Sequence, residues 1–113
     1  MWTWVRLHDG FPRHPKVSGL SDAAFRLHVC AICYAGEYLT DGVVGAHVVA
    51  TLVPRFRAKA LEELLRNGLW TERDGDYEIH DFLEWNRSRA EAERRRQMRS
   101  TAGKKGAEAR WNR

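Results

Sequence analysis

Residues 69–80 decide the fold, and in one-letter code they read LWTERDGDYEIH. The apolar period changes here from about 3.6 residues, typical of a helix, to two residues on either side of Asp74-Gly75. An Asp-Gly pair between two such runs favours a tight hairpin turn, because both central residues of that turn take positive φ angles. The stretch therefore predicts a β-hairpin with strands at 69–72 and 77–80.

A long helix is predicted well before the hairpin. Ser21 is a suitable N-cap and Asp22 favours the first turn, so the helix should run from there to about Tyr38. It is apolar on most sides, which predicts the central helix of the core. Gly36 and residues 39–42 are expected to end it, and a very short strand should follow at Val43-Val44.

Two shorter helices are predicted between this strand and the hairpin. The first covers 46–52 and is stopped by Pro54, and the second covers 57–67 with Gly68 in a C-cap position. So short a connection between two helices is the helix-turn-helix arrangement. With the hairpin as a wing, these elements predict an α+β fold, a small winged helix-turn-helix with a three-helix core. The expected core residues are Leu27, Ala31, Leu61, Leu64, Leu65, Leu69, Trp70, Ile79 and Phe82.

The N-terminal segment gives a different pattern. Residues 2–7 alternate between apolar and polar side chains, which suits a short half-buried strand or an extended arm. Pro12 and Pro15 then predict an irregular, solvated loop over residues 9–16.

The basic residues are concentrated at the other end of the chain. Residues 1–86 contain nine Lys and Arg against twelve Asp and Glu, whereas residues 87–113 contain ten against three. Ser88 and Glu91 form a capping box, which predicts a fourth helix from 88 to about 99 with a flexible, glycine-containing end. We therefore expect a winged-helix domain over 1–86 and a basic helical or flexible tail over 87–113, with the charge expected of a segment that binds a polyanion.

Cellular location is predicted from what the sequence lacks. No apolar run reaches the roughly 20 residues that a membrane span requires, and the opening residues do not have the pattern of a signal for export. Cys30 and Cys33 are too close within one helix to form the disulfide framework of a small secreted protein. A soluble cytoplasmic protein without a membrane partner is expected.

Four segments together are similar to a known family, and they read HPKVSGLSDAAFRLHVCAICYA, LTDGVV, ALEELLRNGLW and DGDYEIHDFLEWNRSR. They resemble the winged-helix, DnaD-like domain at the start of replication-initiation and replisome-organiser proteins of actinobacterial phages and prophages. The ending AGKKGAEARW resembles the glycine-containing basic segment that follows that domain. The resemblance implies DNA binding in phage or mobile-element replication or regulation. It also implies a further C-terminal region, which these residues do not include, so helicase loading and independent initiation are not expected.

The helix-turn-helix offers one group of candidate nucleic-acid-binding residues. A recognition helix enters the major groove through its N-terminal part, where Arg and Lys bond to guanine edges. The outward face of the helix over 57–67 also carries Glu62 and Glu63 and has no net charge, so base reading and a simple solvated face both stay open. The candidates of this group are Arg55, Arg57, Lys59 and Arg66.

The tail offers the second and electrostatically stronger group. Contacts of Lys and Arg with phosphate give affinity without sequence information. The hairpin is not expected to contact phosphate, because Glu72, Asp74 and Asp76 surround Arg73. The tail candidates are Arg87, Arg89, Arg94, Arg95, Arg96, Arg99, Lys104, Lys105, Arg110 and Arg113.

Catalysis and metal binding are not expected. Cys30 and Cys33 have the spacing of metal ligands and His28 is near them, but zinc requires four ligands, and a cysteine within a helix is usually a packing residue. The other histidines have no partner at a catalytic spacing, and no phosphate-binding loop occurs. We expect no enzyme, metal or cofactor.

A competing function is a protein-interaction module that docks a replisome or transcription component. The direction of the tail separates the two functions. A tail against the helix-turn-helix would give one continuous basic surface, whereas a tail that points away would leave the domain free for a protein. The oligomeric state and the preferred DNA are left open.

Overall fold

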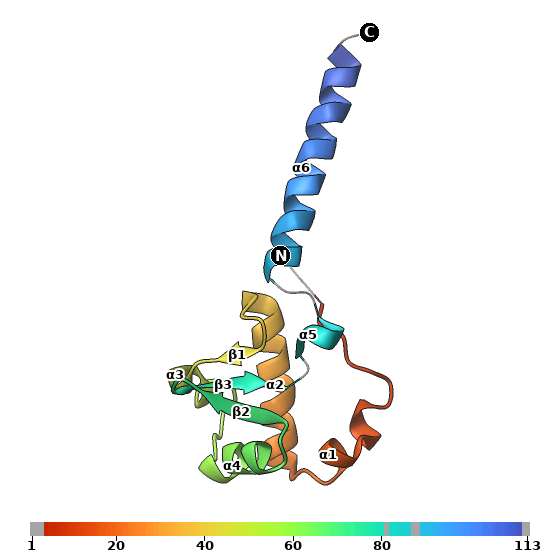
Figure 1. Cartoon of the computed structure of the whole chain (residues 1–113). Helices are drawn as coiled ribbons and strands as arrows, with labels where there is room; N and C mark the ends of the chain where they lie inside the picture. The colour runs from red at the N-terminus through yellow and green to blue at the C-terminus, as the bar shows by residue number, and fades with distance from the viewer. Residues whose placement is uncertain (1–3, 81, 87–88, 112–113) are drawn as a thin grey trace.

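The computed structural model describes residues 4–80, 82–86 and 89–111, of which residues 84–85 and 104–111 are described by their backbone. Its body is α+β, with helices packed around a three-stranded antiparallel sheet of order β1-β3-β2 (Figure 1). No helix in the described part of the chain is both long enough and apolar enough to cross a membrane. In chain order the elements are η1 (Phe11–Arg13), α1 (Pro15–Ser18), α2 (Asp22–Tyr38), β1 (Val43–Val44), α3 (Ala46–Val49), α4 (Ala58–Arg66), β2 (Trp70–Arg73), β3 (Asp76–Ile79), α5 (Phe82–Trp85) and α6 (Arg89–Trp111).

The predicted hairpin is confirmed. Strands β2 and β3 pair in antiparallel register from Trp70 opposite Ile79 to Arg73 opposite Asp76. The two residues of the turn have φ angles of 52° at Asp74 and 84° at Gly75, the positive values that the tight hairpin turn requires. The predicted short strand is β1, which pairs with β3 and so completes the sheet.

The long helix α2 is the centre of the core, as predicted. The Ser21 side chain accepts a hydrogen bond from the backbone N–H of Ala24 and caps its start. Of the nine expected core residues, the following six are buried, while Leu61, Leu65 and Leu69 are partly buried and pack against the core: Leu27, Ala31, Leu64, Trp70, Ile79 and Phe82.

The expected role of Gly36 is wrong. It lies within α2 and does not end it, since the helix continues to Tyr38 and is capped by Leu39 in the left-handed conformation. Val5 lies directly over Gly36, and a Cβ atom at this position would collide with the Val5 side chain. The glycine therefore serves the close approach of the N-terminal arm, which we define as residues 4–20.

Of the two predictions for the first residues, the described part agrees with an arm and not with a strand, since residues 4–8 form no strand and the Asn86 side chain bonds to the backbone N–H and carbonyl of Arg6. The arm differs from its predicted structure in one place. Residues 9–16 are not wholly irregular, since they include η1 and the start of α1. Pro12 and Pro15 occupy the first turns of these short helices, where a proline's missing N–H costs no hydrogen bond.

The predicted pair of short helices is α3 and α4. Helix α3 ends at Val49 and is shorter than the predicted range 46–52, whereas α4 is flanked by Arg57 and Asn67 at its two caps, in agreement with the predicted range 57–67. The order of helices, strand and hairpin is compatible with a small winged-helix-like fold.

The C-terminal helix is longer than predicted. Helix α6 runs without a break to Trp111, so the expected end near residue 99 and the expected flexible segment at Gly103 and Gly106 are wrong. Each glycine costs about 1 kcal/mol relative to alanine in a helix, but most of the residues around them are Ala, Arg, Lys, Glu, Gln and Met, which are strong helix formers. The capping residue Ser88 lies outside the described residues.

Candidate nucleic-acid interface

The four helix-turn-helix candidates lie on or beside α4. Arg55 is in the turn before the helix, Arg57 is its N-cap, and Lys59 and Arg66 lie in its first and last turns. All four side chains are exposed. Leu64, on the opposite side of the same helix, is fully buried against the core, which fixes the face that α4 presents to solvent.

Glu63, which the sequence places on the outward face of α4, has a structural role. Its Oε2 atom accepts hydrogen bonds from the backbone N–H and from the hydroxyl of Ser21, both at 3.0 Å. Because Ser21 caps α2, this carboxylate fastens α4 to the first turn of the central helix. The side chains that remain for a ligand on this part of α4 are Lys59, Glu62 and Arg66.

The hairpin is acidic, and two of its acidic residues are already engaged. Glu78 pairs with Arg73 across the strands, with 3.2 Å between the guanidinium and carboxylate atoms. The Oδ1 atom of Asp76 accepts a hydrogen bond of 3.0 Å from the backbone N–H of Ala46, at the start of α3. Glu72 and Asp74 stay exposed. The hairpin therefore offers no free cation to a phosphate in the part of the chain that the structure describes.

Helix α6 carries the second group of candidates. Arg94, Arg95, Arg96 and Arg99 are exposed, and their positions are spread around the helix and not confined to one face. Arg89 is exposed too, and its Nε atom lies 3.2 Å from Oε1 of Glu93 one turn later. The backbone places Lys104, Lys105 and Arg110 further along the same helix, while Arg87 and Arg113 lie outside the described residues.

The start of α6 is attached to the body at one point that the hydrogen bonds define. The backbone N–H of Arg89 donates a hydrogen bond of 2.8 Å to Oδ1 of Asp41. Asp41 lies between α2 and β1, so this carboxylate accepts a backbone donor that the first turn of a helix leaves unpaired. From this point α6 projects away from the body (Figure 1), and the molecule measures 65 Å in its longest direction.

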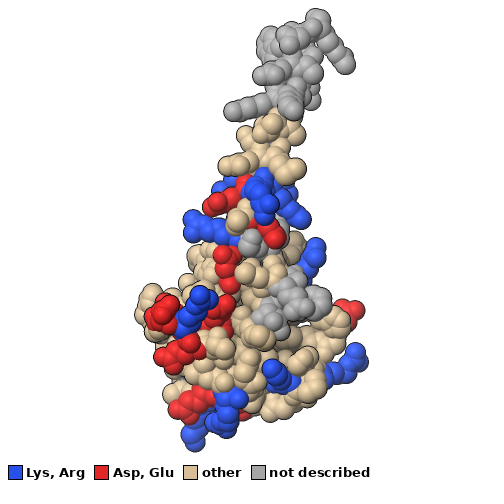
Figure 2. Space-filling view, in the orientation of Figure 1, with Lys and Arg blue, Asp and Glu red and all other residues tan. Residues whose placement is uncertain are grey.

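The two candidate groups are at opposite ends of α2. Glu63 joins α4 to the residue that precedes α2, and Asp41 joins α6 to the segment that follows it. A helix of 17 residues is about 25 Å long, so the two attachment points are separated by roughly that distance. Figure 2 shows basic side chains at the lower end of the body and around the first turns of α6, with acidic side chains over the hairpin at the left. The structure does not join the two groups into one continuous basic surface.

His28 is the main polar residue of the core, and sequence reasoning noted it only as a neighbour of the cysteines. It is 3% exposed, and its Nδ1 atom accepts a hydrogen bond of 2.9 Å from the indole N–H of Trp70. Burial lowers the pKa of His28 to about 4, because the charged imidazolium would lose its hydration. The Phe11 ring stacks on the imidazole with 5.6 Å between centroids. The sequence signals this buried, hydrogen-bonded position only by a histidine within the apolar pattern of α2.

The two cysteines are free thiols. Cys30 is partly buried and Cys33 is exposed. Partial burial, and then the neighbouring Cys30 and Glu37, raise the pKa of Cys33, which lowers its thiolate fraction and its reactivity. Among the residues that the structure describes, no three His, Cys, Asp or Glu side chains are grouped as a metal site would require.

Comparison with protein-family models, curated protein sequences and solved structures found no match to this chain.

Proposed function

We propose that this protein is a cytoplasmic winged-helix protein that binds DNA, with α6 as its main contact with phosphate. The observation that carries the proposal is the set of exposed arginines on several sides of α6. Because α6 projects from the body, a polyanion can approach them without contact with the acidic hairpin, and the same direction leaves the body free for a protein, as the competing function expects. In this proposal the hairpin β2–β3 is the wing and α4 is the recognition helix. No catalytic role is proposed.

The roles of α6 and α4 differ in this proposal. Phosphate contacts by α6 supply affinity for any sequence, because they use charge and do not reach base edges. Arg57 and Lys59, near the N-terminal end of α4, supply whatever sequence preference exists. The resemblance of the sequence to phage replication-initiation domains supports a role in replication or its regulation.

The test compares two full-length variants that lose the same charge. One replaces Arg94, Arg95, Arg96 and Arg99 by Gln, and the other replaces Arg55, Arg57, Lys59 and Arg66 by Gln. Binding to one fluorescent duplex is measured by anisotropy at several salt concentrations. Each phosphate contact contributes roughly 0.9 to the slope of log K against log salt, so four lost contacts lower the slope by about 3 to 4.

The α6 variant should lose about 3 to 4 from the slope, whereas the α4 variant should lose no more than about 2. Circular dichroism confirms that both variants keep their helices. Equal loss in both variants would show that α6 has no special role. An α6 variant with the slope of the wild type would show that this helix does not contact DNA.

One observation favours a second function, the docking of a protein partner by the body. The hairpin exposes Glu72 and Asp74, and its Arg73 is paired with Glu78, so this part of the body presents an acidic surface that a protein partner can contact. Because α6 points away, the body is accessible while α6 is bound. Undetectable binding of duplex DNA by the wild type at low salt would place this function first.

A further inference from the structure

A cavity of about 490 Å³ lies between the N-terminal arm and the body. Its apolar lining comes from the arm and from segments distant in sequence, including Val17, Ile32, Leu69, Ile79 and Phe82. Small-molecule sites in proteins usually have volumes of about 300 to 1,000 Å³ and a mostly apolar lining with a few placed polar groups. The size and the lining of this cavity fit that description.

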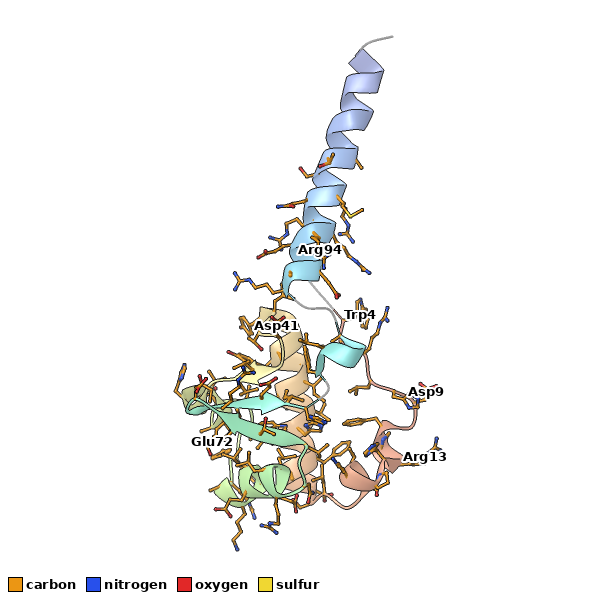
Figure 3. The ribbon with its side chains drawn as sticks, in the orientation of Figure 1. Trp4, Asp9, Arg13, Asp41, Glu72 and Arg94 are labelled. Atoms are coloured by element: carbon orange, nitrogen blue, oxygen red, sulfur yellow. The ribbon has the colours of Figure 1, made fainter. Side chains whose placement is uncertain are left out.

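The arm is held to the body on both sides of the cavity. On one side, the Arg6 backbone N–H donates to Asn86 Oδ1 at 2.7 Å, and the Asn86 amide donates to the Arg6 carbonyl at 3.5 Å. On the other side, Phe11 packs against the rings of Phe25 and His28, with 5.9 Å and 5.6 Å between centroids. In Figure 3 the arm leaves from Trp4 beside α5, reaches its outermost bend near Asp9 and returns at Arg13. The arm therefore forms an anchored wall of a cavity that is open to solvent.

The charged groups of the described lining are cations. Arg6 and Lys16 contribute to the lining, and among the described lining residues there is no Asp or Glu. Asp9, the only acidic residue of the arm, does not line the cavity. Its place at the outer bend leaves the charges of Arg6 and Lys16 uncompensated by the arm itself.

Two histidines of the lining, His14 and His28, add hydrogen-bond donors. His14 Nδ1 accepts the backbone N–H of Lys16 at 3.1 Å, and His28 Nδ1 accepts the Trp70 indole N–H. A neutral imidazole whose Nδ1 is an acceptor carries its proton on Nε2, so that atom is a hydrogen-bond donor. Both rings line the cavity.

We propose that this cavity binds a small organic acid with a flat apolar body. The apolar lining, which includes Phe11 and Phe82, contacts the body of the ligand, and Arg6 and Lys16 bind its acidic group. A neutral apolar ligand would gain nothing from these two cations, while an inorganic anion would leave the apolar lining in contact with water. The combination selects a ligand that has both features.

The probe is 2-naphthoate, and its uncharged amide, 2-naphthamide, is the matched control ligand. Each is titrated into the full-length protein at pH 7.5 and followed by two-dimensional NMR of the backbone amides. Naphthoate should bind at least about tenfold more tightly than naphthamide, since a charge-assisted bond is roughly twice as strong as a neutral one. The amide signals that move should be those of Leu7, Phe11, Ile32, Leu69 and Ile79.

Two single variants locate the acidic group. Lys16→Gln and Arg6→Gln should each weaken naphthoate binding about five- to tenfold, and Arg55→Gln, which removes the same charge far from the cavity, should leave it unchanged. The side chains of all three residues are exposed, and the NMR spectrum of each variant shows directly that it is folded. Any of four results would overturn the proposal. These are no binding at millimolar naphthoate, equal affinity for the two ligands, equal weakening by all three variants, and signal changes confined to α6.

Discussion

Lowering the pH from 7 to 5 should destabilise the folded protein through His28. In the unfolded chain this histidine takes up a proton near its ordinary pKa of 6.5, whereas burial lowers the pKa in the folded protein to about 4. The unfolded state therefore binds more protons between these two values, and linkage shifts the equilibrium toward it. The stability contribution is complete above about pH 6.5, falls as the pH drops toward 4 and changes no further below that.

The size of the effect follows from the two pKa values. The full difference corresponds to about 3 kcal/mol, of which about 2 kcal/mol is lost between pH 7 and pH 5. Stopping at pH 5 keeps most carboxylates ionised, so the measured change belongs mainly to histidine. A change of this size is a large part of the 5 to 15 kcal/mol that typically stabilises a small domain.

The assay is urea unfolding followed by tryptophan fluorescence at pH 7 and pH 5. His28→Asn is the matched variant, because its Oδ1 atom can accept the Trp70 indole N–H and the side chain does not titrate. The variant loses packing at both pH values, so its absolute stability is not compared with that of the wild type. The loss in free energy of unfolding from pH 7 to pH 5 is compared instead, and it should be smaller in the variant by about 2 kcal/mol.

Equal differences in the wild type and the variant would refute this reasoning. NMR of the wild type gives an independent reading if the variant does not fold. The ring signals of His28 should stay unchanged from pH 7.5 to pH 5, and a normal titration in that range would show that its pKa is not lowered.

Three further changes test the core, a helix cap and the cysteines. Leu64→Ala should lower the free energy of unfolding by about 3 kcal/mol, because Leu64 is fully buried, whereas Leu83→Ala at a half-exposed position should cost less than about 1 kcal/mol; urea unfolding compares the two. Ser21→Ala should cost about 1 kcal/mol through the lost cap of α2, and an unchanged unfolding midpoint would contradict that role. The double change Cys30→Ser/Cys33→Ser should leave the circular dichroism spectrum and DNA binding unchanged. Stoichiometric zinc in the purified protein that disappears on this change would show that the thiols hold a metal.

The parts of the fold that the sequence predicted depend on local chemistry. The hairpin follows from a turn whose two residues both take positive φ angles, and the start of α2 follows from a serine that bonds three residues ahead. Such signals involve neighbours in the chain, so they can be recognised without knowledge of the tertiary structure.

The features that were missed depend on contacts between distant residues. Glu63 bonds to Ser21 from 42 positions away, Asp76 to Ala46 from 30, and Asp41 to Arg89 from 48. In the sequence each of these carboxylates looks like an ordinary surface charge or turn residue. Only the packing of the helices and the hairpin gives it a backbone donor, so no local pattern could have identified the partner.

The candidate interface also combines features that local sequence predicted with features that depend on distant contacts. The charge of residues 87–113 identified the basic segment, but its placement involves the hydrogen bond between Asp41 and Arg89 and helix formation through Gly103 and Gly106, which no local pattern indicated. The attachment points of α4 and α6 are about 25 Å apart, which corresponds to about seven base pairs of duplex at 3.4 Å each. In the proposed function, charge on α6 would set the salt dependence of binding and α4 would supply any sequence preference. Because the two groups are attached at opposite ends of α2, we expect substitutions in one group to leave the contribution of the other unchanged.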